Sequence, residues 1–438
     1  MESALDSGNT AWLLTSAALV LLMIPGLAFF YGGMVRSKSV LNMLMMVMGA
    51  LFVVGILWVL VGYSMAFAPS YGNAGLLGNV TAFAGLEGLM ANDPKAGVPA
   101  MGFVAFQAMF ACLTVGLIAG AIADRTKFSA WLIFAGAWAV LVYFPVAHWV
   151  FNLNPETGGW LYKLGVIDFA GGTAVHINAG AAALALAIVI GRRVGWPKTP
   201  MRPHNLTLVM IGAALLWFGW FGFNAGSQIA ADNTAAVVFM NTFIVTCAAG
   251  LGWLATEKIR DGHATSLGAA SGVVAGLVAI TPSCSAVSPL GAIIIGALAG
   301  IICALAVGLK YKFGYDDSLD VVGVHLVGGL VGTLLIGLLA TEAAPAGVNG
   351  LLYGGGLDQL GKQAVGAVAV LLYSLIIAAI LALIIKKTMG FRVDSETEIG
   401  GIDKALHAES AYELGESGGG GVFAGVGHAA RSKSEVES

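Results

Sequence analysis

The sequence predicts an all-α polytopic membrane protein, and its composition and long apolar runs carry that prediction. Of the 438 residues, 58% are hydrophobic and only 10% are charged, whereas soluble domains carry about a quarter charged residues. Glycine is frequent, at 62 residues, and small residues let membrane helices pack closely. The 21 basic and 24 acidic residues nearly balance. This balance argues against a nucleic-acid partner, because such binding needs a basic surface.

Eleven apolar stretches reach, or nearly reach, the roughly 20 residues that a helix needs to cross the hydrocarbon core of a bilayer. The eighth of them is short for a span. The Gly-rich connection between the second and third predicts an ordered surface loop with one short helix. In chain order the stretches cover approximately 11–31, 41–67, 99–122, 129–151, 170–190, 205–227, 234–255, 266–281, 286–309, 320–340 and 363–385.

Basic residues predict the orientation, since short cytoplasmic loops collect Lys and Arg. Fifteen of them lie in alternate loops or just after the last span, three lie in the opposite loops, and three lie in the distal tail. We therefore expect a multi-pass protein of the cytoplasmic membrane with its N-terminus outside and its C-terminus inside. The fifteen are Arg36, Lys38, Arg125, Lys127, Arg192, Arg193, Lys198, Arg202, Lys258, Arg260, Lys310, Lys312, Lys386, Lys387 and Arg392.

The composition changes after Phe391, and we divide the chain there into a transmembrane domain, 1–391, and a cytoplasmic tail, 392–438. The first part of the tail is expected to form a short ordered segment. From about residue 416 the Gly/Ser-rich sequence predicts disorder. The first ten residues, MESALDSGNT, lack the basic region of a cleaved signal peptide, so the first span is expected to stay in the protein.

Histidines are the chief ionisable residues of the predicted membrane interior. His176 lies near the start of the fifth span and His325 near the start of the tenth. Five spans separate the two positions, and a five-span unit that is repeated once must be inverted relative to its first copy, a frequent plan in transporters. We therefore predict inverted repeats over about 11–190 and 205–340, followed by an eleventh helix over about 363–385.

Two neutral imidazoles that meet at mid-membrane can share a proton, because one ring donates while the other accepts. Such a pair suits a small neutral hydrogen-bonding molecule or a proton relay, and it suits a bare cation poorly because desolvation is costly. The alternative is a structural role, in which each buried ring satisfies a neighbouring helix. Asp168 and Asp320 precede the two helices, where a carboxylate caps free N–H groups; Asp168 can also attract a cation from outside.

Five strings, taken in order, resemble the ammonium transporter family (Amt/Mep/Rh). They are PGLAFFYGGMVRSKSVLN at the first span, FQAMFACLTVGLIAG at the third, DFAGGTAVHINAG at the fifth, GWFGFNAGS at the sixth and DDSLDVVGVHLVGG at the tenth. The match covers nearly the whole chain to about Tyr412 and resembles bacterial or archaeal Amt-type members. It implies eleven spans in inverted repeats, a twin-histidine pore, and a homotrimer with one pore in each subunit.

The resemblance also implies residue roles in transport of ammonium or methylammonium, in which ammonium is recruited outside and deprotonated, and ammonia passes the histidines with a proton relay. The family often has Trp where Phe151 aligns, and whether Trp149 or Phe151 completes the outer site stays open. The matching residues are the pore histidines His176 and His325, the gate Phe110 and Phe223, the recruitment residues Phe106, Trp149, Phe151, Ser227 and Asp168, and the pore-lining Trp220.

The tail string GIDKALHAESAY is similar to the regulatory tail of the family. In bacterial and archaeal members a PII-type signal protein docks on the cytoplasmic face, and the resemblance implies that partner here. We predict neither enzymatic activity nor a cofactor. No metal site is predicted either, since the four cysteines show no CxxC spacing.

Three functions from other classes compete with transport of ammonium. A water or glycerol channel is disfavoured because the chain has no Asn-Pro-Ala pair and eleven predicted spans. A membrane metalloenzyme is disfavoured because no HEXXH string or acidic third ligand accompanies the histidines. An ammonium sensor that signals through its tail with little flux is not separated from a transporter by sequence; binding without flux would favour it.

Overall fold

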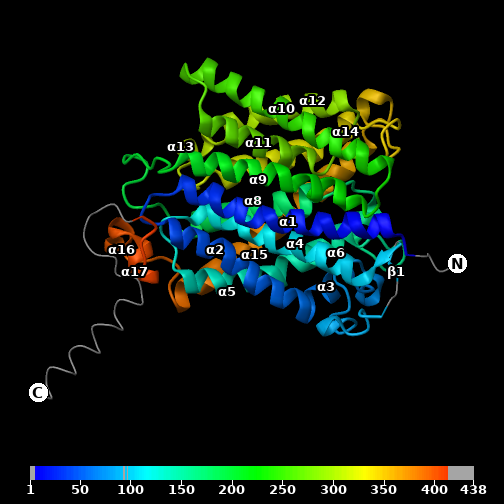
Figure 1. Ribbon diagram of the computed structural model, residues 1–438, viewed down its shortest axis with the longest axis horizontal. Coiled ribbons are helices and arrows are strands. Elements are labelled where there is room, and N and C mark those ends of the chain that lie inside the picture. Colours follow the sequence, from blue (N-terminus) through cyan, green and yellow to red (C-terminus); the bar gives the residue numbers. More distant parts are fainter. Residues whose placement is uncertain (1–4, 92–93, 96, 413–438) are drawn as a thin grey trace, which may run out of the picture.

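The computed structural model describes residues 5–91, 94–95 and 97–412. Helices form nearly all of the regular structure there (Figure 1). The α-helices are α1 (Ser7–Met34), α2 (Val40–Leu57), α3 (Tyr63–Phe67), α4 (Ala100–Ile118), α5 (Phe128–Trp138), α6 (Phe144–Phe151), α7 (Trp160–Leu164), α8 (Asn178–Ile190), α9 (Leu206–Ala225), α10 (Asn233–Asp261), α11 (Ser266–Ile280), α12 (Pro289–Ala306), α13 (Leu309–Phe313), α14 (Val327–Leu339), α15 (Asp358–Thr388), α16 (Ser395–Gly400) and α17 (Ile402–His407).

Tighter and wider turns interrupt or extend these helices. The π-helical segments are Trp58–Gly62, Ala139–Tyr143, Gly172–Ile177 and Val322–Leu326. The 3-10 turns are Tyr71–Asn73, Ala84–Leu86, Ala119–Ile122, Gly226–Gln228 and Leu351–Tyr353. Two short strands, β1 (Pro94–Lys95) and β2 (Val98–Pro99), pair antiparallel in the loop before α4, with Pro94 opposite Pro99.

Ten helical stretches of the described chain are long and apolar enough to cross a membrane. Two of them continue through a π-helical segment, so that α2 runs on into α3 and α5 into α6. The 15-residue helix α11 is apolar but shorter, and it coincides with the stretch that is short in the sequence. Helices α16 and α17 form the predicted ordered start of the tail. The predicted disorder from about residue 416 falls on 413–438, outside the described residues.

Polar side chains fix where several long helices begin. The carboxylate of Asp6 accepts from Asn9 N at 2.7 Å, and the amide oxygen of Asn205 accepts from Leu208 N at 2.9 Å. These bonds satisfy N–H groups that the first helical turn leaves free. The same kind of cap starts α10 at Asp232, α11 at Thr265 and α12 at Ser288.

The helices pack at distances that only small residues allow. A Cβ on Gly212 in α9 would lie 2.3 Å from Phe30 N in α1, and one on Gly300 in α12 would lie 2.2 Å from Ala249 O in α10. Such close approach is typical of membrane helix bundles. In Figure 1 the long helices lie roughly side by side, and the N-terminus is at the end opposite α16 and α17.

Candidate functional site

The two histidines predicted from the sequence lie on π-helical segments, His176 before α8 and His325 before α14. A π-helical turn holds an extra residue and often marks a functional site. The rings face each other with Nδ1 atoms 3.2 Å apart and planes inclined by 21°. Their exposed fractions are 0% and 4%. Since the contact joins two ring nitrogens, one must donate and the other accept.

Backbone packing and an indole hold this pair in place. A Cβ on Gly180 would lie 2.5 Å from Leu326 N, so this glycine allows α8 to approach the segment that carries His325. Trp220 stacks on His176 at 5.4 Å between ring centroids, and its Nε1 donates to Thr281 Oγ1 at 2.9 Å. Nε2 of His176 is buried and has no hydrogen-bond partner among the described residues. A small molecule beside that nitrogen would complete its bonding.

Two stacked phenylalanines lie next to the histidines. The rings of Phe110 and Phe223 are 4.1 Å apart and inclined by 17°, and Phe223 lies 6.2 Å from His176. Both phenylalanines are at most 1% exposed. Phe106 packs on Phe110 at 4.9 Å and is fully buried. The surface that Phe223 and Phe110 place beside His176 is therefore aromatic carbon.

A cavity of about 650 Å³ opens on the other side of the stack, and we call it the vestibule. Phe110, Phe151, Ser227 and Asp168 are among its lining residues. The hydroxyl of Ser227 donates to Phe223 O at 2.7 Å, which leaves its oxygen lone pairs free to accept from a cation. Aromatic faces can attract a cation as well.

The structure separates the two aromatics that the sequence leaves as alternatives. Phe151 lines the vestibule and meets Phe110 edge to face at 6.4 Å. Trp149 packs against Trp160 and Tyr373 and donates to Leu76 O at 2.7 Å. Trp149 is thus held by the loop after α3 and by α15, and its ring does not line the vestibule.

Asp168 caps the segment that carries His176. Its carboxylate accepts from the backbone N–H groups of Gly171, Gly172, Thr173 and Ala174, and from the Thr173 hydroxyl. Because Asp168 also lines the vestibule, it places a fixed negative charge there as well as starting the helix.

Asp317 caps the segment that carries His325, and the expectation that Asp320 caps this helix is wrong. Asp317 accepts from Val321 N at 3.1 Å and Val322 N at 2.8 Å. Asp320 instead has a positive φ of 62° and pairs with Lys310 Nζ at 2.6 Å. Asp320 stands directly before the first helical residue, but its carboxylate is paired with Lys310. Each capping aspartate precedes its histidine by eight residues, 168 to 176 and 317 to 325, and this equal spacing was a usable signal.

Residues 11–412 match the model of the Ammonium Transporter Family. The chain belongs to this family. It is 62% identical to an ammonium transporter of Mycobacterium tuberculosis, covering 94% of this chain and 92% of that one, and 46% identical to one of Aquifex aeolicus, covering 94% and 95%. Among solved structures, "Sensor Amt Protein" matches with a TM-score of 0.85 at 30% identity over 91% of this chain and 98% of that one. Mep2 of Saccharomyces cerevisiae matches with 0.83 at 33% over 90% and 89%.

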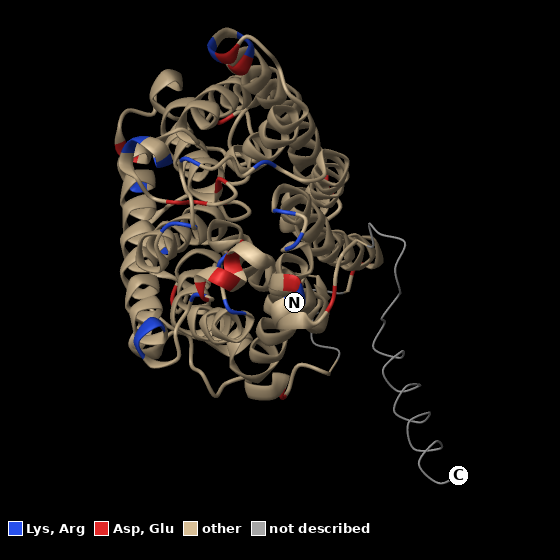
Figure 2. Ribbon diagram, turned by 90° about the vertical axis from the view of Figure 1, so that its left-hand side faces the viewer, with Lys and Arg blue, Asp and Glu red and all other residues tan. Residues whose placement is uncertain are grey.

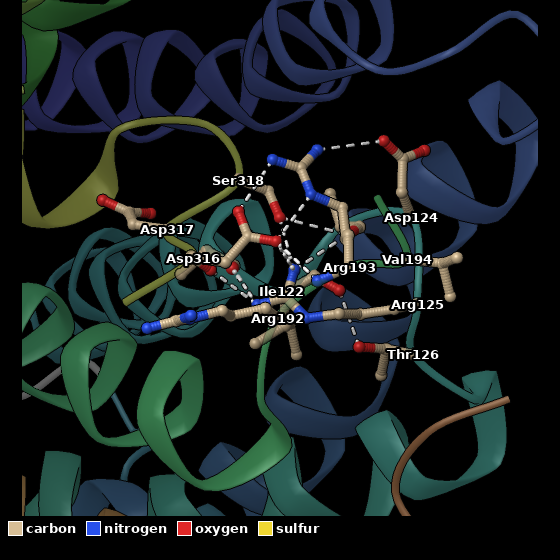
Figure 3. A network of polar contacts seen from close by, with 12 residues as sticks. Ile122, Asp124, Arg125, Thr126, Arg192, Arg193, Val194, Asp316, Asp317 and Ser318 are labelled. Carbon is tan, nitrogen blue, oxygen red and sulfur yellow. Dashed lines mark hydrogen bonds and ion pairs between the residues drawn. The ribbon is translucent and has the colours of Figure 1, made fainter. Parts of the chain in front are cut away.

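This member of the ammonium transporter family also has a buried charge network that sequence reasoning missed (Figure 3). Arg125 is fully buried and donates to Ser318 Oγ at 2.5 Å and to Asp316 O at 2.6 Å. Arg193 donates to both carboxylate oxygens of Asp316, at 2.8 and 2.9 Å, and lies 3.3 Å from Asp124. Buried charges persist only when paired and hydrogen-bonded. The network therefore ties together three loops at one end of the helices.

Burial and neighbouring charges shift pKa values in this network. Burial lowers the pKa of Arg125 to about 10, against the raising effect of Asp316. Burial and the nearby Asp320 raise the pKa of Asp317 to about 6, against the lowering effect of Lys310. Figure 2 looks onto this end of the transporter and shows both basic and acidic residues there. The sequence showed these residues only as a count of charges in loops.

Proposed function

We propose that this chain carries ammonium across the cytoplasmic membrane by removing its proton at the vestibule and conducting ammonia past His176 and His325. The observation that supports this most is the buried imidazole pair with the unpartnered Nε2 of His176. Ammonia can both donate to and accept from such nitrogens. Family membership gives ammonium as the substrate, and the pair supplies a site where the neutral form is held better than the ion.

Recruitment takes place in the vestibule. Ammonium approaches the faces of Phe110 and Phe151, and Ser227 Oγ accepts a hydrogen bond from one of its N–H groups. The fixed charge of Asp168 favours the cation at this mouth. Backbone N–H donors already surround the Asp168 carboxylate. Asp168 therefore attracts ammonium by its charge at a distance more than by direct contact.

Deprotonation follows from the aromatic stack. A cation that leaves water for a buried apolar site loses solvation, which the stack of Phe110 and Phe223 cannot replace. Ammonium escapes this cost by giving up its proton, whereas potassium cannot. Nε2 of His176 takes up this proton, the ring releases its Nδ1 proton to Nδ1 of His325, and net transport carries charge.

The proposed architecture follows the family pattern. We assign eleven membrane spans, of which α11 is the short one. The first ten spans form two inverted five-span repeats over about 11–190 and 205–340. Helix α15 is the eleventh span and lies outside the repeats. The N-terminus lies outside and the tail 392–438 inside. The assembly is a homotrimer with one pore in each subunit, and a PII-type signal protein is the cytoplasmic partner. The equal eight-residue spacing from capping aspartate to histidine supports the repeat.

Uptake by proteoliposomes tests the proposal. Vesicles that contain the protein should accumulate methylammonium and generate an inward current when ammonium is added outside. Potassium at the same concentration should give no current above that of protein-free vesicles. Equal currents for the two ions would overturn the deprotonation step. Binding of ammonium without uptake would favour the alternative function as an ammonium sensor. The names of the transporter relatives do not support that alternative.

A further inference from the structure

Helix α15 carries a row of buried polar side chains although much of its surface is exposed and apolar. Val368, Leu372 and Ile376 are exposed, whereas Gln363 and Ser374 are fully buried. A polar group buried in a membrane helix is costly unless it is hydrogen-bonded. The buried row should therefore do something that an apolar helix cannot.

Gln363 binds the backbone at two places through one amide. Its Oε1 accepts from Ile167 N at 2.8 Å, and its Nε2 donates to Ile167 O at 2.7 Å. Nε2 also reaches Thr333 O at 3.3 Å. Gln359 donates to Gln363 Oε1 at 2.9 Å and to Gly165 O at 3.2 Å, and this second amide fixes the orientation of the first.

These backbone partners lead directly to the two histidines. Ile167 immediately precedes Asp168, the cap of the segment that carries His176. Thr333 lies in α14, which continues from the segment that carries His325. One side chain of α15 therefore bonds to both elements whose positions set the gap between the imidazoles.

Ser374 provides a second contact from the same helix. Its hydroxyl donates at 2.7 Å to the carbonyl oxygen of Asn178, the first residue after the π-helical segment that ends at Ile177. Gln363 and Ser374 thus hold the backbone on both sides of the segment that carries His176. A π-helical segment has no ideal α-helical ladder to keep it in register, so external contacts can decide its position.

We infer that α15 is a strut for the imidazole pair and that Gln363 is a positioning residue for transport. This inference rests on the proposed function of the pair. The Nδ1 atoms are 3.2 Å apart, near the long end of a hydrogen bond, and the interaction weakens steeply with further separation. Loss of the amide contacts should let the two segments separate and interrupt the proton path, with little change in the vestibule aromatics.

The test compares Gln363→Met with Asn241→Leu. Asn241 in α10 is also a fully buried amide that clasps two backbone carbonyls, Cys284 O and Val287 O, both at 2.9 Å, and it bonds to neither histidine segment. At equal amounts of folded protein we expect Gln363→Met to lower the ammonium current at least about tenfold, the scale on which misplaced reacting groups lose rate. Asn241→Leu should stay within about twofold of wild type, since it disturbs stability alone.

Two further readouts separate positioning from a general loss of stability. In a cryo-electron microscopy structure of Gln363→Met, the two Nδ1 atoms should lie beyond about 3.5 Å, the limit of a hydrogen bond. The apparent KM for methylammonium should change much less than the maximal rate. Should Gln363→Met fail to fold, Ser374→Ala removes the second contact more gently and should reduce the current by about threefold.

The outcomes also separate this inference from the proposed function. In one outcome His176→Ala abolishes the current, while Gln363→Met, or Ser374→Ala in its place, behaves like Asn241→Leu. The positioning role of α15 is then wrong, and the imidazole pathway stands. If His176→Ala conducts like wild type, the proposed function fails whatever Gln363→Met does. An unchanged imidazole separation in Gln363→Met would likewise contradict the strut.

Discussion

Under the proposed function, the aromatic side chain at the edge of the vestibule determines how strongly a cation is held there. Phe151 occupies that edge, and Trp149, two residues earlier, is turned toward Trp160 and Tyr373. Phenylalanine is a weaker cation–π partner than tryptophan. The neighbouring tryptophan does not compensate, because its ring is committed to packing and its Nε1 to Leu76 O.

Replacing this phenylalanine should tighten recruitment. In Phe151→Trp we expect the apparent KM for methylammonium to fall by about two- to fivefold, because an exposed cation–π contact contributes about 0.5–1 kcal/mol. Concentration series of uptake measure this shift. Trp149→Phe is the control, with an apparent KM within about twofold of wild type. A larger change in the control than in Phe151→Trp would show that the assignment of the two rings is reversed.

Asp317 gives a pH dependence of stability with a definite sign. Its pKa in the folded protein is raised from 3.8 to about 6 by burial and Asp320. The folded state therefore binds a proton more readily than the unfolded state, and the ionised carboxylate costs stability at pH 7. As pH falls through about 6 toward 4, this cost disappears. Compared with Asp317→Asn, the melting temperature of wild type should rise between pH 7 and pH 5; a parallel course of the two proteins would contradict the assignment.

Among the elements, the ordered part of the tail completes a helix in the bundle. Helix α2 begins after Ser39, whose side chain makes no capping bond. Asp403 in α17 supplies the cap instead, accepting from Leu41 N at 3.0 Å and Asn42 N at 2.8 Å. Glu398 in α16 strengthens the docking, because its carboxylate accepts from Val194 N at 2.6 Å. The tail and the start of α2 are therefore one structural unit.

Loss of the Asp403 cap should destabilise the first turn of α2. Asp403→Ala should cost about 1 kcal/mol, the usual value of an N-cap, and should speed hydrogen exchange at the amides of Leu41 and Asn42. Asp394→Ala removes the equivalent cap of α16, whose carboxylate accepts from Thr397 N at 2.8 Å, and should leave exchange in α2 unchanged. Equal protection of α2 in wild type and Asp403→Ala would mean that the tail does not cap it.

The apolar runs predicted where the long helices lie, because hydrophobic length is a local property of the chain. The twin histidines were also predictable, since a polar residue in an apolar run stands out. The π-helical segments, the capping role of Asp317 and the burial of Arg125 were not, because each depends on which loops meet in space. The choice between Trp149 and Phe151 likewise needed the packing of α15, which the sequence does not place.

Across the whole molecule, a vestibule, an aromatic stack and an imidazole pair follow one another inside a bundle held by close-packed helices. The stack of Phe110 and Phe223 separates the vestibule from His176. Under the proposed function, this order would let the protein bind ammonium as a cation in the vestibule and hold it as ammonia beside the buried imidazoles. The buried network around Arg125 and Asp316 joins the loops at one end of the same bundle. These contacts hold the helices that carry the site in fixed positions.

Current recording on solid-supported membranes can show whether ammonium transport depends on the imidazole pair, with wild type, His176→Ala and His325→Ala compared at equal protein density. His204→Gln, an imidazole outside the site, is the control and should conduct like wild type. We expect either pore-histidine variant to lose the ammonium current by at least about tenfold, because proton transfer by a positioned group contributes a hundredfold or more. Wild-type ammonium currents in both pore-histidine variants would contradict it.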